Sequence, residues 1–197
     1  MSKLIICLSG KAGSGKSTLG KKLAKVYGLK YVSGGDTLKN LAHNLGYNNI
    51  DEGWWETNEG QQFLKERQSS LDFDRKIDNI LIGMAKKGDV VIDSWTIPWL
   101  IKNNSCIKIW LEATQELRAQ RVANRDGISL QKAYKMIKEK DKISKQIYKK
   151  LYGFNFGDDF SPFDLVINIE KFDSIEIFLL VSIVVDIFKK KYSKKDS

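Results

Sequence analysis

The chain has 197 residues, of which 42% are hydrophobic and 29% are charged, and its formal net charge is +9. This length and composition predict one soluble globular domain with a single buried core. They exclude a disulfide framework, because the chain has only two cysteines, and a membrane span, because the most apolar segment, 175–188, is too short and is interrupted by Glu176 and Asp186.

The positive charge favours polyanionic ligands such as nucleotides, and charge alone leaves nucleic acid or an anionic membrane surface open. Much of the excess is lysine near the C-terminus. We expect residues 191–197 to form a basic, solvated tail rather than a binding site. We expect no membrane partner, and nucleic acid is a less favoured partner than a nucleotide. The chain begins with a strand-like run that lacks a basic leader, and we therefore expect a cytoplasmic protein.

Short apolar runs alternate with helical or polar segments along the chain. The predicted strands cover residues 4–8, 31–33, 90–93, 107–111 and 165–169. This alternation predicts βαβ units and an α/β fold in which helices cover both faces of a parallel sheet. We assign residues 1–190 to this one domain and expect ligands at the carboxyl ends of its strands.

The segment Gly10-Lys11-Ala12-Gly13-Ser14-Gly15-Lys16-Ser17-Thr18 follows the first predicted strand and opens a helix. It fits the P-loop pattern, in which glycines let backbone N–H groups point inward around phosphate oxygens. Lys16 would reach the β- and γ-phosphates, and the Ser17 hydroxyl would bind the Mg²⁺ that bridges them. A glycine-rich turn without function would not combine motif, strand and helix in this way. We therefore predict ATP binding by Gly10, Ala12, Gly13, Ser14, Gly15, Lys16, Ser17 and Thr18.

The second predicted strand leads into Ser33-Gly34-Gly35-Asp36 and a helix. Gly34 and Gly35 would let the backbone approach a ligand closely, and Asp36 could cap the helix without any ligand. Lys39, one turn into the helix, could swing toward a ligand above the sheet. The following segment, 44–71, contains Trp54 and Trp55 and fits either a mobile flap over an acceptor site or a surface helix with an aromatic foot.

A clear helical pattern over residues 73–81 places Asp74 and Asp78 four residues apart on one face. Stacked carboxylates need a partner, which could be a ligand donor, a basic side chain or water. The third predicted strand then ends at Asp93, the position of a Walker-B aspartate that helps to hold Mg²⁺. Trp95, just beyond it, could stack on a ring or close the core.

After the fourth predicted strand, a helix carries Arg118, Arg121 and Arg125 on one face. Such guanidinium groups could stabilise a transferring phosphoryl group, or form salt bridges on a solvated face. Asp126-Gly127 would end this helix and Ser129 would cap the next, so the turn would form the tip of a lid over residues 115–150. The second lid helix is rich in lysine, including Lys140.

The chain resembles nucleoside monophosphate kinases, and most closely the archaeal-type cytidylate kinases. The resemblance rests on the P-loop, on Ser33-Gly34-Gly35-Asp36, on residues 73–78 and 89–93, and on Tyr152-Gly153 before the last predicted strand. It implies a five-stranded parallel P-loop kinase core, an acceptor-binding region at about 36–87, a short helical lid, and transfer of the ATP γ-phosphoryl group to CMP or dCMP. In this interpretation Lys16, Arg118, Arg121 and Arg125 are catalytic, and Ser17 and Asp93 manage Mg²⁺. The acceptor would contact Ser33, Gly35, Asp36, Lys39, Asp74, Asp78 and Trp95.

Several positions depart from the family pattern. Lys39, Trp95, Asn79, Ile147 and Lys140 stand where the family usually has arginine. A charge-assisted contact to phosphate contributes about 1.5–3 kcal/mol, so the acceptor site is altered unless other groups compensate. A kinase of the same fold with another small acceptor, and a non-catalytic nucleotide-binding protein, are therefore the alternatives to a (d)CMP kinase. We expect a monomer.

Overall fold

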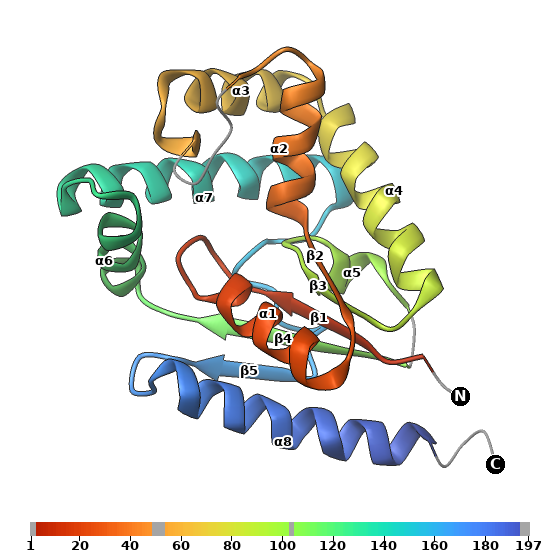
Figure 1. Ribbon diagram of the computed structural model, residues 1–197. Helices are drawn as coiled ribbons and strands as arrows, with labels where there is room; N and C mark the ends of the chain where they lie inside the picture. The colour runs from red at the N-terminus through yellow and green to blue at the C-terminus, as the bar shows by residue number, and fades with distance from the viewer. Residues whose placement is uncertain (1–2, 49–53, 103–104, 194–197) are drawn as a thin grey trace.

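The computed structural model describes residues 3–48, 54–102 and 105–193 (Figure 1). The described strands are β1 (Ile5–Ser9), β2 (Lys30–Ser33), β3 (Val90–Asp93), β4 (Cys106–Glu112) and β5 (Leu165–Asn168). The described helices are α1 (Lys16–Tyr27), α2 (Gly34–Asn44), the 3₁₀ turn η1 (Trp54–Glu56), α3 (Asn58–Ser69), α4 (Asp72–Lys87), α5 (Ile97–Leu100), α6 (Gln115–Asp126), α7 (Leu130–Tyr152) and α8 (Ser174–Ser193).

The five strands form one sheet in the order β2-β3-β1-β4-β5, and every neighbouring pair is parallel. The register places Leu8 of β1 and Ser33 of β2 on either side of Asp93 at the end of β3. The loops that follow these three strands therefore emerge together at one edge of the sheet. The α/β fold with a parallel five-stranded core is confirmed.

Alternating residues of the buried strand β1 supply two separate cores. Ile5 and Cys7 face the side covered by α2, α4 and α5, whereas Ile6 and Leu8 face the side covered by α1 and α8. Figure 1 shows these two helical layers above and below the sheet. Because both faces are buried, β1 and β3 are near-continuous apolar runs up to their last residues, Ser9 and Asp93, rather than alternating sequences.

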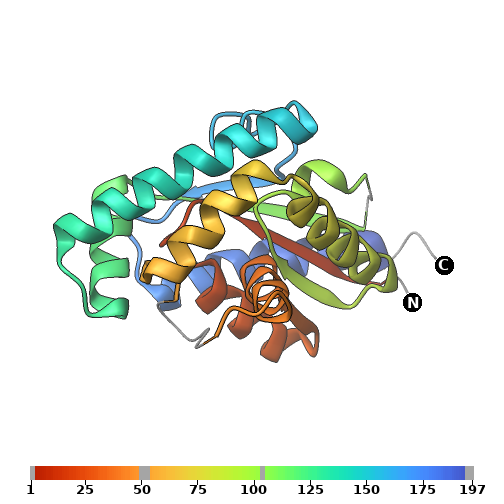
Figure 2. The ribbon, with the colours of Figure 1, turned by 90° about the horizontal axis from the view of Figure 1, so that it is seen from above.

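A third, aromatic cluster joins the sheet to the long helix α7. Trp110 and Phe156 are fully buried there beside Tyr148, and the ring of Trp99 stacks on Phe154 with 4.2 Å between ring centres. Seen from above in Figure 2, α7 runs along one side of the molecule with α3 beside it. This cluster sets the position of α7, and with it the lysine-rich face, over the sheet edge.

Segment 44–71, for which the sequence allowed either a mobile flap or a surface helix, contains η1 and α3. Trp54 is 1% exposed and packs against Phe63 of α3 with 5.7 Å between ring centres. This arrangement is the helix with an aromatic foot, although Trp54 is buried rather than at the surface. Residues 49–53 of the same segment lie outside the described residues.

The helix ends follow local rules, with one correction. The N-cap of α2 is Ser33, whose hydroxyl accepts a hydrogen bond from the backbone N–H of Asp36. Asp36 therefore does not cap this helix; it lies inside the first turn, where its charge complements the helix dipole. Gly127 ends α6 in a left-handed conformation and Ser129 caps α7, as the sequence predicts.

The last apolar segment packs on the sheet as α8. Ile177, Val181 and Val185 are buried against it. The helix continues through Ser193, so the first residues of the expected basic tail are helical. Within the described residues, no helix combines the length and apolar character that a membrane crossing needs. Cys7 and Cys106 are both buried and free.

Candidate active site

The loop between β1 and α1 wraps into a backbone cradle. Gly10 and Gly13 have φ angles of 144° and 81°, which favour glycine. A Cβ on Gly10 would come within 2.5 Å of the Leu111 carbonyl oxygen, and one on Gly13 within 2.7 Å of the Arg118 carbonyl oxygen. Side chains are thus excluded because the loop is pressed against the end of β4 and the first turn of α6.

The cradle lies at the start of a helix that has no side-chain cap. Gly15 is the N-cap residue of α1, so the first N–H groups of this helix receive no side-chain acceptor from it. The Ser14 hydroxyl is buried and has no hydrogen-bond partner among the described residues. Free N–H groups, a helix N-terminus and an unpaired buried hydroxyl together form a site for an anion.

Lys16 points back over this cradle. Its ammonium group donates to the Lys11 carbonyl oxygen at 3.1 Å, and the residue is 8% exposed. Burial lowers the pKa of Lys16, while the charges of Asp93 and Asp141 act in the opposite direction. A buried cation held by a neutral carbonyl oxygen is well placed to donate hydrogen bonds to phosphate oxygens.

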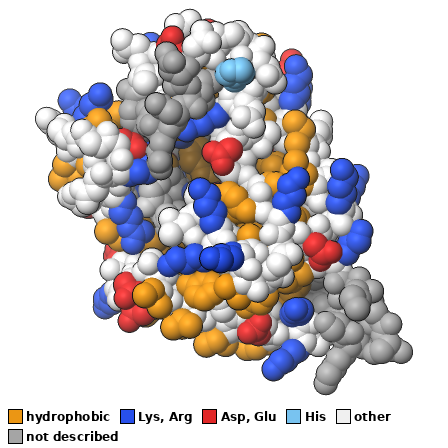
Figure 3. Space-filling view, in the orientation of Figure 1, with side chains coloured by type: hydrophobic (Ala, Val, Ile, Leu, Met, Phe, Trp, Pro, Cys, Tyr) orange, Lys and Arg blue, Asp and Glu red, His pale blue; other side chains and the backbone are white. Residues whose placement is uncertain are grey.

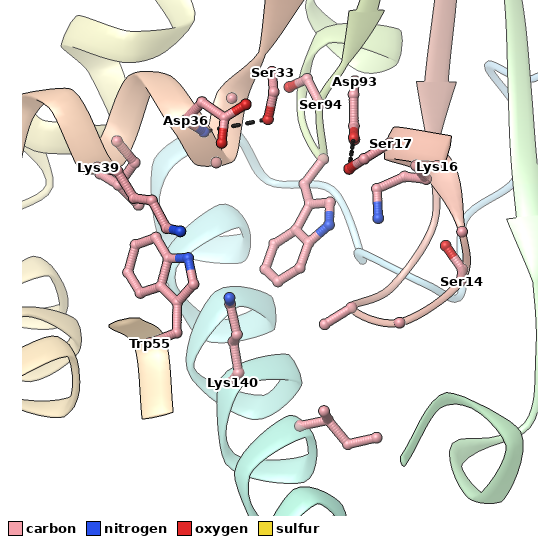
Figure 4. Close-up of a pocket in the computed structure, with 18 of the residues that line it drawn as sticks. Ser14, Lys16, Ser17, Ser33, Asp36, Lys39, Trp55, Asp93, Ser94 and Lys140 are labelled. Carbon is pink, nitrogen blue, oxygen red and sulfur yellow. Dashed lines mark hydrogen bonds between the residues drawn. The ribbon is translucent and has the colours of Figure 1, made fainter. Parts of the chain in front are cut away.

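The predicted pair of Mg²⁺ residues is brought together across 76 residues of sequence. The Ser17 hydroxyl donates to Oδ2 of Asp93 at 2.7 Å (Figure 4). The Tyr31 hydroxyl donates to the same oxygen at 3.1 Å. Burial, followed by the charge of Asp93, raises the pKa of Tyr31, which stays a neutral donor. Hydroxyl and carboxylate oxygens beside a phosphate cradle are the donor set that Mg²⁺ prefers.

The three arginines of α6 do not share one environment. Arg121 and Arg125 line the cavity above the cradle, and Arg121 Nη1 lies 3.7 Å from the position of a Cβ on Gly15. Arg125 forms an ion pair with the adjacent Asp126 at 2.5 Å. Arg118 instead is buried under the cradle, where it donates to the Ala12 carbonyl oxygen at 3.1 Å and pairs with Asp141 of α7 at 2.9 Å. It does not line the cavity.

One cleft of about 1030 Å³ joins the cradle to the predicted acceptor region. All the predicted ATP-binding residues except Gly10 line it, and so do all seven predicted acceptor residues. The predicted acceptor residues are Ser33, Gly35, Asp36, Lys39, Asp74, Asp78 and Trp95. His43, which we interpret from the sequence as a surface residue, is exposed at the rim of the same cleft.

Two indoles and a lysine occupy the middle of the cleft. The Lys140 ammonium group lies 4.4 Å from the ring centre of Trp55 and 5.8 Å from that of Trp95. Figure 4 shows Lys39 and Lys140 reaching toward Trp55 from α2 and α7. Trp95 is also 6.0 Å from the Lys16 ammonium group, and its ring packs on Phe156. The contact with Phe156 supports the interpretation of Trp95 as closing the core, and its stacking on a ligand ring stays a prediction.

Asp74 forms an ion pair with Arg67, which no pattern in the sequence indicates. Arg67 of α3 donates from Nε and Nη2 to the two carboxylate oxygens of Asp74, at 2.8 and 2.6 Å, and Nη2 also donates to the Tyr148 hydroxyl at 2.8 Å. Arg67 is 3% exposed, and Arg67, Asp74 and Tyr148 all line the cleft. An isolated arginine in a polar segment carries no spacing signal, so only the packing of α3 against α4 and α7 reveals it.

Asp78 is held by two hydroxyl groups rather than by a direct ion pair. It accepts hydrogen bonds from Thr96 and, at 2.6 Å, from Tyr152. Burial raises the pKa of Asp78 to about 6; the two hydroxyl donors act against burial, and the neighbouring Asp74 adds to it. A buried carboxylate held by neutral donors is a ready acceptor for a ligand N–H group.

Two of the five departures from the family pattern lie away from the cleft. Asn79 is exposed on the outer side of α4, and Ile147 is buried in the aromatic cluster; neither lines the cavity. Lys39, Trp95 and Lys140 do line it. The alteration of the acceptor side is therefore concentrated in two lysines and one indole.

Comparison with known proteins agrees with this geometry. A model of the cytidylate kinase-like family matches residues 5–171. A cytidylate kinase of Pyrococcus horikoshii is 37% identical over 184 residues, covering 93% of this chain and 89% of that protein. A cytidylate kinase of Methanocaldococcus jannaschii is 30% identical over 190 residues, covering 95% of this chain and all of its own length (100%).

Solved structures extend the likeness to the fold. An uncharacterized protein from Eubacterium ventriosum superposes with a TM-score of 0.67 at 21% identity, covering 93% of this chain and 99% of that one. Shikimate kinase from Acinetobacter baumannii, solved with shikimate, gives a TM-score of 0.54 at 18% identity and covers 96% of both chains. At these identities the likeness establishes the P-loop kinase fold alone.

Proposed function

The chain belongs to the cytidylate kinase-like family, and we propose that it transfers the γ-phosphoryl group of ATP to CMP or dCMP. The observation that carries this proposal is a single cleft with a phosphate cradle at one end and a charged, aromatic wall at the other. Such a cleft holds two anionic substrates with their phosphates facing each other. Phosphoryl transfer between anions needs mainly positioning and charge stabilisation, which is what these residues offer.

On the donor side, the cradle N–H groups and Lys16 bind the ATP phosphates. Ser17 and Asp93, whose oxygens lie 2.7 Å apart, are the residues that would hold Mg²⁺. When bound, Mg²⁺ would supply positive charge that offsets the negative charge of the ATP phosphate oxygens. Arg121 and Arg125, which line the cleft above the cradle, add positive charge where negative charge develops in the transition state.

Arg118 has a different task in this proposal. Its contacts with Ala12 and Asp141 tie α6, α7 and the cradle together. We therefore assign Arg118 to positioning the cradle against the lid helices, while Arg121 and Arg125 face the phosphates. We further propose that residues 115–150 form the lid and residues 36–87 the acceptor-binding region of the kinase domain. We expect a cytoplasmic location.

On the acceptor side, Lys39 and Lys140 take the acceptor phosphate in place of arginines. Both approach the same space from opposite helices, α2 and α7 (Figure 4). A lysine supplies the charge but not the two-pronged hydrogen bonding of a guanidinium, so two lysines compensate for the missing arginines. Asp78 and the Arg67–Asp74 pair offer an acceptor and donors to the base and sugar, and Trp95 offers a stacking face.

The test is ADP release from Mg·ATP with CMP, dCMP, UMP, AMP and GMP as acceptors, beside shikimate, gluconate and a no-acceptor control. We expect turnover with CMP and dCMP, and its loss in Lys16→Ala while ATP-independent properties such as the thermal melt stay unchanged. Retained turnover in Lys16→Ala would overturn the P-loop assignment. Turnover restricted to another acceptor would instead favour the second candidate, a kinase of this fold whose acceptor site is reshaped around Trp95.

A further inference from the structure

Tyr31 of β2 supplies a hydroxyl group to the carboxylate at the end of the neighbouring strand. The phenol donates to Oδ2 of Asp93 at 3.1 Å, and the same oxygen accepts the hydrogen bond from Ser17. The sheet register pairs Asp93 with Ser33, two residues beyond Tyr31, so the tyrosine side chain reaches its partner along the strands rather than directly across them. The contact therefore depends on where the tyrosine ring lies.

A glycine inside α1 makes room for this ring. Gly20 is buried in the helix, where glycine is less favourable than alanine. A Cβ at this position would lie 2.7 Å from Cε2 of Tyr31, so a larger residue would displace the ring. Ser17 precedes Gly20 by three residues and therefore lies on the same side of α1. One turn of α1 thus provides both the space for the Tyr31 ring and the second hydroxyl on Asp93.

A basic side chain lies beside the same ring. Figure 3 shows lysine and arginine side chains on the face of the molecule where α1 lies. The ammonium group of Lys21, an exposed residue of α1, is 6.0 Å from the ring centre of Tyr31, and a cation at this distance is attracted to the face of an aromatic ring. Packing on Gly20, the cation of Lys21 and the hydrogen bond to Asp93 together fix the position of the Tyr31 side chain.

We propose that Tyr31 is a positioning residue for Mg²⁺ binding, because its hydroxyl holds the Asp93 carboxylate in place beside the phosphate cradle. This inference rests on the proposed function, in which Ser17 and Asp93 hold the ion. The Ser17 oxygen would have to serve the ion as well as Asp93, whereas the Tyr31 hydroxyl can stay on the carboxylate. Tyr31 does not line the cleft, so it acts through Asp93 rather than by touching a substrate. Groups that hydrogen-bond to metal ligands orient them in this way.

Binding of a divalent ion to the protein–ATP complex tests the inference without turnover. Mn²⁺ suits the same oxygen ligands as Mg²⁺, and its free concentration can be measured by EPR with the full-length protein in excess over ATP and no acceptor present. Tyr31→Phe keeps the ring and removes the hydroxyl. It should weaken Mn²⁺ binding about 10-fold, while the affinity for ATP in EDTA stays unchanged.

Tyr27→Phe is the matched control for this substitution. The Tyr27 hydroxyl also donates to a carboxylate, that of Asp186 at 2.9 Å, but Tyr27 does not line the cleft and its partner belongs to α8. Its removal should leave Mn²⁺ binding at the wild-type value. Thermal melts of both variants measure the general effect of losing a hydroxyl–carboxylate hydrogen bond on stability.

Gly20→Ala tests the position of the ring while the Tyr31 hydroxyl is still present. The added methyl group should displace the ring and weaken Mn²⁺ binding several-fold. In the Tyr31→Phe background there is no hydroxyl left to displace, so Gly20→Ala should weaken Mn²⁺ binding further by less than about twofold. Equal effects in the two backgrounds would mean that Gly20 acts through α1 itself, and would contradict its role in placing Tyr31.

The outcomes separate this inference from the proposed function. Unchanged Mn²⁺ binding in Tyr31→Phe overturns the inference, and so does an equal loss of Mn²⁺ binding and of ATP affinity in EDTA, which would indicate a general structural role. A wild type that shows the expected dependence on Tyr31 but phosphorylates neither CMP nor dCMP would overturn the proposed acceptor and support the inference. A wild type that binds no ATP would overturn both.

Discussion

Replacing Asp78 by asparagine tests whether ionisation of this buried carboxylate destabilises the folded protein. Burial raises its pKa from 3.8 to about 6, against the two hydroxyl donors Thr96 and Tyr152 and the more distant charge of Arg67. This shift of roughly two pKa units corresponds to about 3 kcal/mol of lost folding free energy when Asp78 is ionised.

The sign follows from proton binding. Between pH 3.8 and about 6 the folded protein holds a proton on Asp78 that the unfolded chain has lost, so this group lowers the free energy of unfolding as the pH rises through that window. Above about pH 6, Asp78 is ionised in both the folded and the unfolded state, and the full loss of folding free energy of about 3 kcal/mol remains. The asparagine side chain of the variant carries no charge at any pH, and its amide keeps one acceptor for Thr96 or Tyr152. Asp78→Asn should therefore match or fall slightly below the wild type near pH 4 and exceed it by about 2–3 kcal/mol near pH 7.

Urea denaturation of both proteins at half-unit steps from pH 4 to 8 measures this difference. Contributions from all other carboxylates cancel when the variant is compared with the wild type at each pH. A difference that stays constant across the range would mean that Asp78 ionises as in an unfolded chain, and the reasoning from burial would be refuted. The same variant should raise the KM for CMP more than the KM for ATP, because Asp78 lies on the acceptor side of the cleft.

Two further substitutions probe the proposed acceptor side of the cleft. Arg67→Leu leaves the buried Asp74 without its cation and should lower the free energy of unfolding by about 3–5 kcal/mol in urea denaturation. The control Arg75→Leu removes an exposed pair with Asp72 at 3.6 Å and should lower it by less than about 1 kcal/mol. Equal effects would contradict a structural role for the buried pair. Lys140→Met should raise the KM for CMP by roughly one to two decades with little change in the KM for ATP, and the exposed Lys142→Met of the same helix should change neither.

The geometry of the proposed donor half could be predicted from the sequence because its residues are close together along the chain. The P-loop places its glycines, Lys16 and Ser17 within nine consecutive residues, and the strand before and helix after them fix the geometry. Asp93 was predictable for a related reason: it ends an apolar strand, and parallel strands bring their carboxyl ends to one edge. The 2.7 Å contact between Ser17 and Asp93 follows from this edge and from the strand order.

The acceptor half depended on packing between helices that are distant in sequence. Asp74 and Asp78 were identified from their spacing, but their partners come from α3, α7 and the β3–α5 loop, which no spacing rule relates to α4. Spacing along the helix also failed to predict the environment of Arg118. It shares a helical face with Arg121 and Arg125, but it is buried in an ion pair with Asp141 of α7, whereas the other two line the cleft.

The sequence by itself therefore determined the α/β fold, the glycine-rich backbone cradle and the positions of Ser17 and Asp93 beside it, because strand periodicity and a contiguous motif carry that information. Only the tertiary structure decided which cations face the cleft and which carboxylates are already paired. Those properties depend on burial, and burial is set by the docking of whole helices such as α3, α7 and α8 on the sheet rather than by any local pattern in the chain.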